Sequence, residues 1–332
     1  MEAFHKRDLH EGFNRGFKSQ SAMEYLMTYG WAILIIAVVL AALFELGVFN
    51  PMTFAPKASP GSCQVVRPEG AGTTAFISIS GECNGEIPQY VAYFTGKPME
   101  GIHIPLYTTN FSISLWFYDN NPAGTYYGCG PYAGCSTPIF DIYNASTNNG
   151  VGGGQNFDFS ALGANNGGAI SYAEYWPQDW QTYTTPSGSI APHTWENVII
   201  SIANYDAVNV SVNGYLYSTT FTVPSNTALA EMVNPTLGFT SNPPGGDEIS
   251  SNIYIANFQL YDSALSSNEM QALYQEGIGG APISIQSLIG WWPLNGNAND
   301  YSGDNDNGGA SYNYYNGGPT FIGSWYSGYR VP

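Results

Sequence analysis

The stretch VNVSVNGYLYSTTFTV, residues 208–223, decides how the chain folds. Apolar and polar residues alternate on both sides of Asn213-Gly214, and Asn-Gly between two alternating runs is the strongest two-residue signal for a β-hairpin. The same alternation recurs in FSISLWFYD (111–119), WENVIISIANYD (195–206) and NIYIANFQLYD (252–262). Each run predicts a strand with one buried face, so the larger part of the chain is predicted to be mainly β.

A short helix is predicted after these strands, over ALSSNEMQALYQEG (264–277), capped by Ser266 or Ser267 and stopped at Gly277. This order resembles the laminin-G-like/concanavalin A-like lectin fold, which implies a jelly-roll β-sandwich over residues 90–332. The resemblance is carried by these segments: Phe111 to Phe117, Trp195 to Ile202, Val212-Asn213-Gly214, Ile255 to Phe258, Ala264 to Ser266, and Leu273-Tyr274.

The order of the segments is unusual for that fold. WWPLNGNANDYSGDNDNGG (291–309) resembles the opening strand and loop of such a domain, yet it lies near the carboxyl terminus, while residues 90–105 resemble the second strand region. We therefore expect a circularly permuted sandwich in which residues 286–332 pair beside the strand near 90–105. The alternative is a truncated second copy, but the 40 residues after Trp292 are too few for a second sandwich. The segment could enter its own domain or that of a neighbouring subunit.

Charge is scarce and uneven in this chain. Only 10% of the 332 residues are charged, the formal net charge is −17, and the chain has 39 Gly and 25 Tyr, which suits a β-rich extracellular protein. Half of the eight basic residues, Lys6, Arg7, Arg15 and Lys18, precede an apolar run. Since basic residues stay on the cytoplasmic side, the acidic part is expected outside the membrane. Such an acidic chain argues against binding to nucleic acid.

The apolar run is long enough to cross a membrane, because the 20 residues from Tyr25 to Phe44 carry no charge. It predicts a transmembrane or filament-core helix over 20–49. The segment ahead of it, Lys18 to Glu24, resembles the processing site of archaeal type IV prepilins, whose class III signal peptide is cut before a glutamine. Ser19 stands where such a site is expected to have Gly or Ala.

This second resemblance implies a leader over 1–19, removed by a prepilin peptidase between Ser19 and Gln20. Glu24 would then be the fifth residue of the mature chain and would face the amino terminus of another copy of the chain in a filament. Ser21-x-x-Glu24 is also a capping box, which would begin any membrane helix. An uncleaved membrane anchor is therefore the alternative.

Four cysteines favour two disulfides in an exported chain. Their neighbourhood pairs Cys63 with Cys83 and Cys129 with Cys135. A zinc site is the weaker reading because the sequence has no CxxC pair. The first bridge would staple a β-hairpin within the connector, residues 50–89.

Three kinds of site are expected on the sandwich. Domains of the lectin-like family often hold calcium, and the densest oxygen-bearing cluster is Asn295, Asn297, Asp300, Asp304 and Asp306, with Asp119 as an added ligand. The alternative is a solvated turn. Trp176, Trp180 and Tyr183 are expected to stack on sugar rings, unless they fill the core. Asn110, Asn144 and Asn209 match the glycosylation pattern.

Catalysis finds little support in the sequence. Glycosidases of this fold place carboxylates at alternate positions of one strand, and no such run is present. We therefore expect a non-enzymatic subunit of an archaeal type IV pilus-like surface filament, with no organic cofactor and a lectin-like head for adhesion or glycan binding. The alternatives are a membrane-anchored carbohydrate-binding protein that does not assemble, and an extracellular enzyme acting on polysaccharides.

Overall fold

The computed structural model describes residues 17–45, 57–83, 87–95, 109–120, 136–143, 156–162, 168–176, 179–204, 206–220, 233–237, 239–240, 249–250, 252–308, 311–312, 319–320 and 324–327. The chain forms two compact units, Met1–Ala55 and Pro56–Pro332. The division into leader, helix, connector and sandwich at residues 19, 49 and 89 stays a prediction.

The first unit contains one long helix, α1 (Phe17–Glu45). Its stretch Met23–Phe44 is apolar and long enough to cross a membrane, and none of the residues that the structure describes buries it. A helix that is apolar on every side and uncovered needs an apolar environment, either lipid or other helices. The predicted apolar helix is confirmed, although it begins before Gln20 and ends at Glu45.

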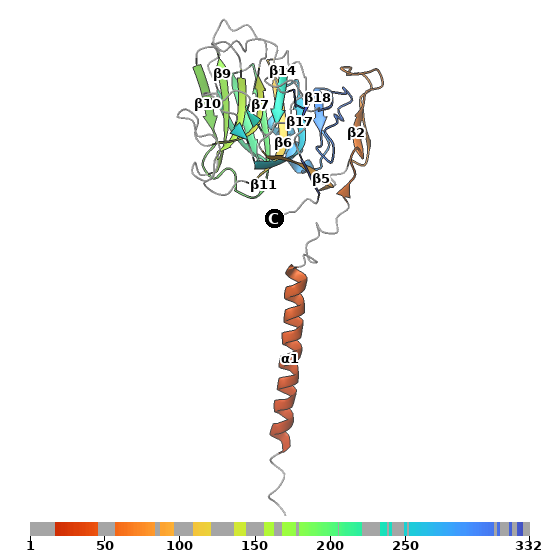
Figure 1. Cartoon of the computed structure of the whole chain (residues 1–332), viewed down its shortest axis with the longest axis vertical. Coiled ribbons are helices and arrows are strands. Elements are labelled where there is room, and N and C mark those ends of the chain that lie inside the picture. The colour runs from red at the N-terminus through yellow and green to blue at the C-terminus, as the bar shows by residue number, and fades with distance from the viewer. Residues whose placement is uncertain are drawn as a thin grey trace, which may run out of the picture. The chain divides into compact units, whose positions relative to one another are not determined.

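The second unit is a sandwich of two antiparallel sheets (Figure 1). The order of the larger, eight-stranded sheet is β13 (Tyr215–Thr220), β12 (Ala207–Val212), β11 (Trp195–Ala203), β6 (Phe111–Asp119), β17 (Asn252–Tyr261), β5 (Tyr90–Thr95) and β21 (Ser324–Ser327), with β18 (Leu288–Trp292) also paired to β17. The order of the five-stranded sheet is β10 (Asp179–Thr184), β9 (Ala169–Trp176), β8 (Asn156–Leu162), β7 (Ser136–Tyr143) and β14 (Val233–Leu237).

Short two-stranded pieces accompany the sandwich. They are β1 (Lys57–Ala58) with β4 (Ile87–Pro88), β2 (Cys63–Val66) with β3 (Ser78–Gly81), β15 (Phe239–Thr240) with β16 (Ile249–Ser250), and β19 (Ser311–Tyr312) with β20 (Pro319–Thr320). The disulfide Cys63–Cys83 closes the β2–β3 hairpin, as predicted. The second predicted pair, Cys129 and Cys135, lies outside the described residues.

The core lies between the two sheets. Because successive side chains of a strand point to opposite faces, every second residue of β6 enters it, namely Phe111, Ile113, Leu115 and Phe117. Phe140, Ile170, Tyr172 and Leu237 meet them from the five-stranded sheet. The alternation in the sequence is therefore the alternation of the core, and the predicted mainly β sandwich is confirmed.

Helix α3 (Ser267–Glu276) packs on the outer face of the eight-stranded sheet and covers part of it. It buries Met270 and Leu273 in a second apolar cluster with Tyr261 and Trp291 of the sheet. Ser266 caps the helix in a capping box with Glu269, and the chain leaves it at Gly277, as the sequence predicts.

The end of the chain returns to the sheet in which the sandwich begins. Strand β18 pairs with β17, and β21 pairs with β5, where Trp325 lies opposite Ala92. The predicted return of residues 286–332 beside the strand near 90–105 is confirmed. In this structure the returning strands complete the sandwich of their own chain.

Candidate functional site

The outward-facing residues of β6 change character along the strand. Ser112 lies under the cover, where its Oγ donates to the carbonyl oxygen of Ser263 at 2.8 Å and accepts from the amide of Leu265 at 2.9 Å. Further along, Trp116 stacks on Tyr274 of α3 with ring centroids 6.0 Å apart. Tyr118, two residues later, touches aromatic rings of the sheet itself. Along the outward face of β6, Ser112 therefore lies under the segment that leads into α3, Trp116 lies against α3 itself, and Tyr118 contacts rings of the sheet.

Four aromatic residues form a row across the sheet at this end. Tyr93, Tyr254, Tyr118 and Trp195 are direct cross-strand partners on β5, β17, β6 and β11, so their side chains share one face. The ring centroids are 4.5 Å apart for Tyr93–Tyr254, 5.7 Å for Tyr254–Tyr118 and 5.8 Å for Tyr118–Trp195. Tyr326 of β21 adds a ring 5.3 Å from Tyr254. We call these five residues the aromatic face.

Among the residues that the structure describes, the aromatic face is only partly covered. Its rings are partly exposed, and Tyr326 is 37% exposed. Burial, and then the hydroxyls of Tyr93, Tyr326 and Tyr118, raise the pKa of Tyr254. The phenol therefore stays protonated at neutral pH and can both donate and accept hydrogen bonds.

Polar side chains border the aromatic face. The hydroxyl of Tyr93 donates to Asn252 Oδ1 at 2.7 Å, and Asn120 Nδ2 donates to the same oxygen at 3.3 Å. The exposed His193 ring lies 6.2 Å from Tyr118. A surface of partly open rings with hydroxyl and amide groups at its rim matches a sugar, which has an apolar ring face and a rim of hydroxyls.

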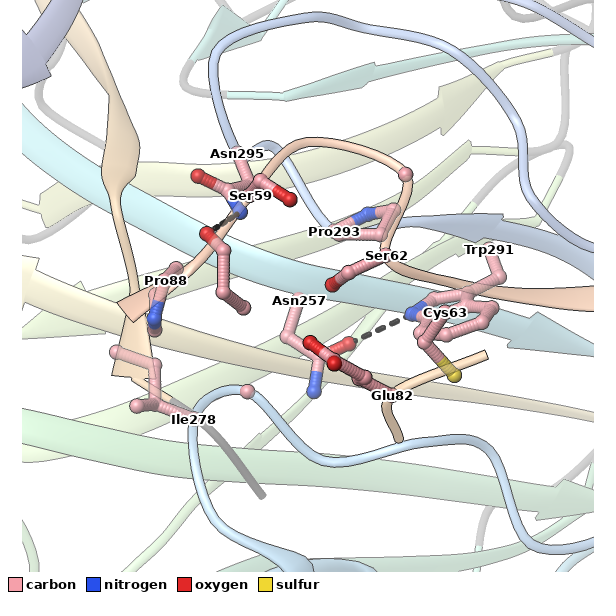
Figure 2. Close-up of a pocket in the computed structure, with 13 residues that line it drawn as sticks. Ser59, Ser62, Cys63, Glu82, Pro88, Asn257, Ile278, Trp291, Pro293 and Asn295 are labelled. Atoms are coloured by element: carbon pink, nitrogen blue, oxygen red, sulfur yellow. Dashed lines mark hydrogen bonds between the residues drawn. The ribbon is translucent and has the colours of Figure 1, made fainter. Parts of the chain in front are cut away.

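A small pocket lies in the same unit, and Figure 2 shows the residues that line it. Ile278 lines it and also packs in the cluster to which Trp116, Trp195 and Tyr254 belong. The pocket has a volume of about 40 Å³ and lies between the disulfide hairpin and strands β17 and β18. Its polar walls carry Ser59, Ser62, Glu82, Asn257 and Asn295, and its apolar walls include Pro88, Trp291 and Pro293.

The predicted sugar-stacking residues lie elsewhere. Trp176 and Trp180 belong to β9 and β10 of the five-stranded sheet, and their side chains lie outside the described residues. Tyr183 of β10 packs against the central core, where burial and then Tyr217 raise its pKa. The structure therefore does not bring these three residues to the aromatic face, and sugar contact by them stays a prediction.

The predicted calcium ligands form hydrogen bonds and an ion pair with other residues of the chain. Asn295 accepts from the amide of Tyr90 and donates to the carbonyl oxygen of Ala58, each at 2.8 Å. Asn297 bonds to the hydroxyl of Tyr301, and Asp304 pairs with Arg67 at 3.2 Å. These oxygens already face protein donors.

Of the predicted calcium ligands, Asp300 accepts four hydrogen bonds. Its Oδ1 accepts from the amides of Trp291 at 2.9 Å and Ser302 at 2.8 Å, and its Oδ2 accepts from the Ser302 hydroxyl at 2.7 Å and the amide of Asp306 at 3.1 Å. Asp119 ends β6, opposite Ile253. Within the described residues no group of three or more His, Cys, Asp or Glu side chains is placed to hold a metal. The arrangement does not fit calcium as it stands, and calcium binding stays a prediction.

The remaining predicted sites lie in local contacts. Asn110 Oδ1 accepts from the amide of Asn204 at 2.8 Å, and Asn209 Oδ1 accepts from the Ser218 hydroxyl at 2.6 Å. Asn144 lies outside the described residues. Ser19 and Gln20 lie in the first turn of α1, and Glu24 is exposed on the same helix. Glycosylation, processing and assembly at these residues stay predictions.

Comparison with known proteins finds no matching family model and no matching curated protein. Among solved structures, the chain is similar to botulinum neurotoxin type C, whose cell entry depends on two ganglioside molecules, with 18% identity over 52% of this chain and 36% of that one, at a TM-score of 0.36. A heptameric SAP-like pentraxin from Limulus polyphemus matches with 15% identity over 67% of this chain and 88% of that one, at 0.40. A mutant Trypanosoma rangeli sialidase that displays trans-sialidase activity matches with 16% identity over 52% and 24%, at 0.36.

The chain thus spans about a third of the length of the toxin chains it matches. Likeness at these values says nothing about ligands, and the β-sandwich rests on the strands and register of this chain itself.

Proposed function

We propose that the β-sandwich binds glycans at the aromatic face and that α1 holds it at the cell surface. The observation that carries the proposal is the row Tyr93, Tyr254, Tyr118 and Trp195, which stays partly exposed where the cover of α3 ends. Aromatic cross-strand pairs also stabilise sheets, by about 0.2–1 kcal/mol each. Stability alone does not require them to gather at one uncovered end of several strands.

The charge of the surface supports the same conclusion. The five residues of the aromatic face carry no charge, in a chain whose net charge is −17. Tyr and Trp offer a large contact area with few rotatable bonds, so a bound ligand costs them little conformational entropy. The proposal concerns binding without catalysis.

Binding should depend on two residues of the row. In a panel of immobilised polysaccharides probed with the full chain in detergent, we expect Trp195→Ala and Tyr254→Ala each to weaken binding to the retained polysaccharide about tenfold or more, which corresponds to about 1.4 kcal/mol. Tyr215→Ala is the matched control, because Tyr215 is 73% exposed on β13, at the far edge of the sheet.

Two results would contradict the proposal, provided that the melting temperatures of the variants show an intact fold. Either the panel retains no polysaccharide at all, or both variants bind as tightly as the wild type while Tyr215→Ala does the same.

For the first unit, the proposal is a filament subunit of the archaeal type IV pilus kind, in which α1 packs with copies of itself after a prepilin peptidase removes residues 1–19. The uncovered apolar surface of Met23–Phe44 supports packing in a helix bundle or in lipid. A permanent anchor is the second candidate, and one observation favours it: α1 begins at Phe17, so the predicted cut falls inside the helix.

The amino-terminal sequence of the protein separates these candidates. For a filament subunit we expect material sheared from cells to begin at Gln20. Chains that begin near Met1 and occur only in membranes would overturn the filament and leave an anchored glycan-binding domain.

A further inference from the structure

We infer that the pocket beside the aromatic face binds a primary ammonium group, so that the glycan is a polymer containing amino sugars. The inference rests on the proposed function and names the class of its ligand. The pocket has one charged residue among those that line it, Glu82, and no basic one (Figure 2).

Each side chain with an N–H group that lines the pocket donates a hydrogen bond inside the protein. Trp291 Nε1 donates to Asn257 Oδ1 at 2.8 Å, Asn257 Nδ2 donates to the carbonyl oxygen of Gly280 at 2.8 Å, and Asn295 Nδ2 donates to that of Ala58 at 2.8 Å. The carboxylate of Glu82 and the hydroxyls of Ser59 and Ser62 also line the pocket. Carboxylate and hydroxyl oxygens accept hydrogen bonds, and an ammonium group carries three donors and no acceptor.

Glu82 has no cation in the part of the chain that the structure describes. It is exposed, and the ion pair found among those residues joins Arg67 to Asp304. The nearest basic side chain along the hairpin, Arg67, is buried, and its guanidinium donates to the carbonyl oxygens of Ser302, Thr73 and Leu288. A ligand cation would therefore meet a carboxylate that no described residue neutralises.

The size of the pocket selects a substituent rather than a ring. A volume of about 40 Å³ holds roughly three water molecules, since one water needs about 10–15 Å³ measured in this way. A sugar ring would remain outside while its amino group enters. Ile278 lines the pocket and belongs to the apolar cluster against which Tyr254 and Trp195 pack, so the sugar ring would lie toward the aromatic face.

Other sugar substituents fit less well. A carboxylate of an acidic sugar would be repelled by Glu82. A neutral hydroxymethyl group would enter but would leave the charge of Glu82 without a partner. A lysine side chain carries the same ammonium group, but it offers the aromatic face no sugar ring.

The test is titration calorimetry of the full chain in detergent with a glucosamine hexamer and with its N-acetylated form, which has no charge. We expect the free amine form to bind about tenfold more tightly, because hydrogen bonds to a charged partner are the stronger ones. Glu82→Gln should abolish this preference. Glu69→Gln, the same change at an exposed position of the same hairpin that does not line the pocket, should preserve it.

The control separates the pocket from general attraction of a cationic polymer to an acidic protein. A preference that survives in Glu82→Gln, or that Glu69→Gln lowers equally, overturns the inference. So does a lysine hexapeptide that binds as tightly as the glucosamine hexamer. If neither hexamer binds but another polysaccharide does so through Trp195 and Tyr254, the inference fails and the proposed function stands. If no glycan binds, both fail.

Discussion

Replacing Arg67 by alanine should lower the free energy of unfolding of the second unit by about 3–5 kcal/mol, the usual cost of removing one partner of a buried ion pair. Arg67 is 9% exposed and its guanidinium uses three nitrogens at once. Nε donates to the carbonyl oxygen of Ser302 at 2.9 Å and meets Asp304 at 3.2 Å, while the other two nitrogens reach Thr73 and Leu288 at 2.5 Å each. The substitution would leave the Asp304 carboxylate without its cation.

Urea unfolding of the full chain in detergent, followed by tryptophan fluorescence, measures this effect. Arg67→Lys should also lose most of the stability that Arg67 contributes, because an ammonium group cannot reproduce the hydrogen bonds that the planar guanidinium donates from three nitrogens. Lys57→Ala removes a positive charge from an exposed position of the same unit and is expected to stay within about 0.5 kcal/mol of the wild type. If the stability of Arg67→Ala also stayed within about 0.5 kcal/mol of the wild type, the predicted stabilising role of Arg67 would be contradicted.

The hydrogen bonds of Arg67 should also matter for ligand binding. Arg67 follows β2 in the disulfide hairpin, and its hydrogen bonds join the hairpin to β18 at Leu288 and to the following loop at Ser302. The hairpin contributes Cys63 and Glu82 to the pocket, whose other wall is the sheet. A variant that loosens the hairpin should therefore lose the preference for amino sugars even where the aromatic face remains intact.

Local patterns in the sequence were sufficient for most of the fold. The alternation in residues 111–119 and 252–262 predicts both the strands and which residues enter the core, because a strand repeats every two residues and register follows the buried face. The Asn213-Gly214 turn and the cap of α3 are likewise local. The disulfide hairpin follows from two nearby cysteines.

The candidate site depends on pairing between strands that are far apart in the chain, and this pairing cannot be predicted from local sequence patterns. Tyr93, Tyr118, Trp195 and Tyr254 belong to strands far apart in the chain, and only the register places them in one row. One local signal was present: on β6 the outward residues change from Ser112 and Ser114, which are buried, to Trp116 and Tyr118, which are partly exposed. The sequence instead concentrates aromatic residues between Trp176 and Tyr183, but the strands that carry them, β9 and β10, belong to the five-stranded sheet.

The second large effect is expected at Asp300, because its carboxylate organises the loop after β18. It is 8% exposed and accepts four hydrogen bonds, three of them from backbone amides. Asp300→Ala should lower the free energy of unfolding by about 3 kcal/mol or more, since each buried donor left unsatisfied costs about 1–3 kcal/mol. Asp300→Asn keeps the shape and one acceptor oxygen, and we expect it to lose less. Asn299→Ala, in the same loop and exposed, should be nearly neutral.

The same loop tests the calcium prediction. Because the oxygens of Asp300 and Asn295 already accept hydrogen bonds from protein donors, the melting temperature of the wild type should be the same in excess EDTA and in millimolar calcium. A ligand that binds only the folded state raises its stability by mass action, so calcium binding would raise the melting temperature. A melting temperature that rises with calcium in the wild type and in Asn299→Ala, but not in Asp300→Asn, would show that the loop rearranges around the ion. The Asp/Asn cluster would then be the metal site that the sequence predicts, and its hydrogen bonds would describe the metal-free form.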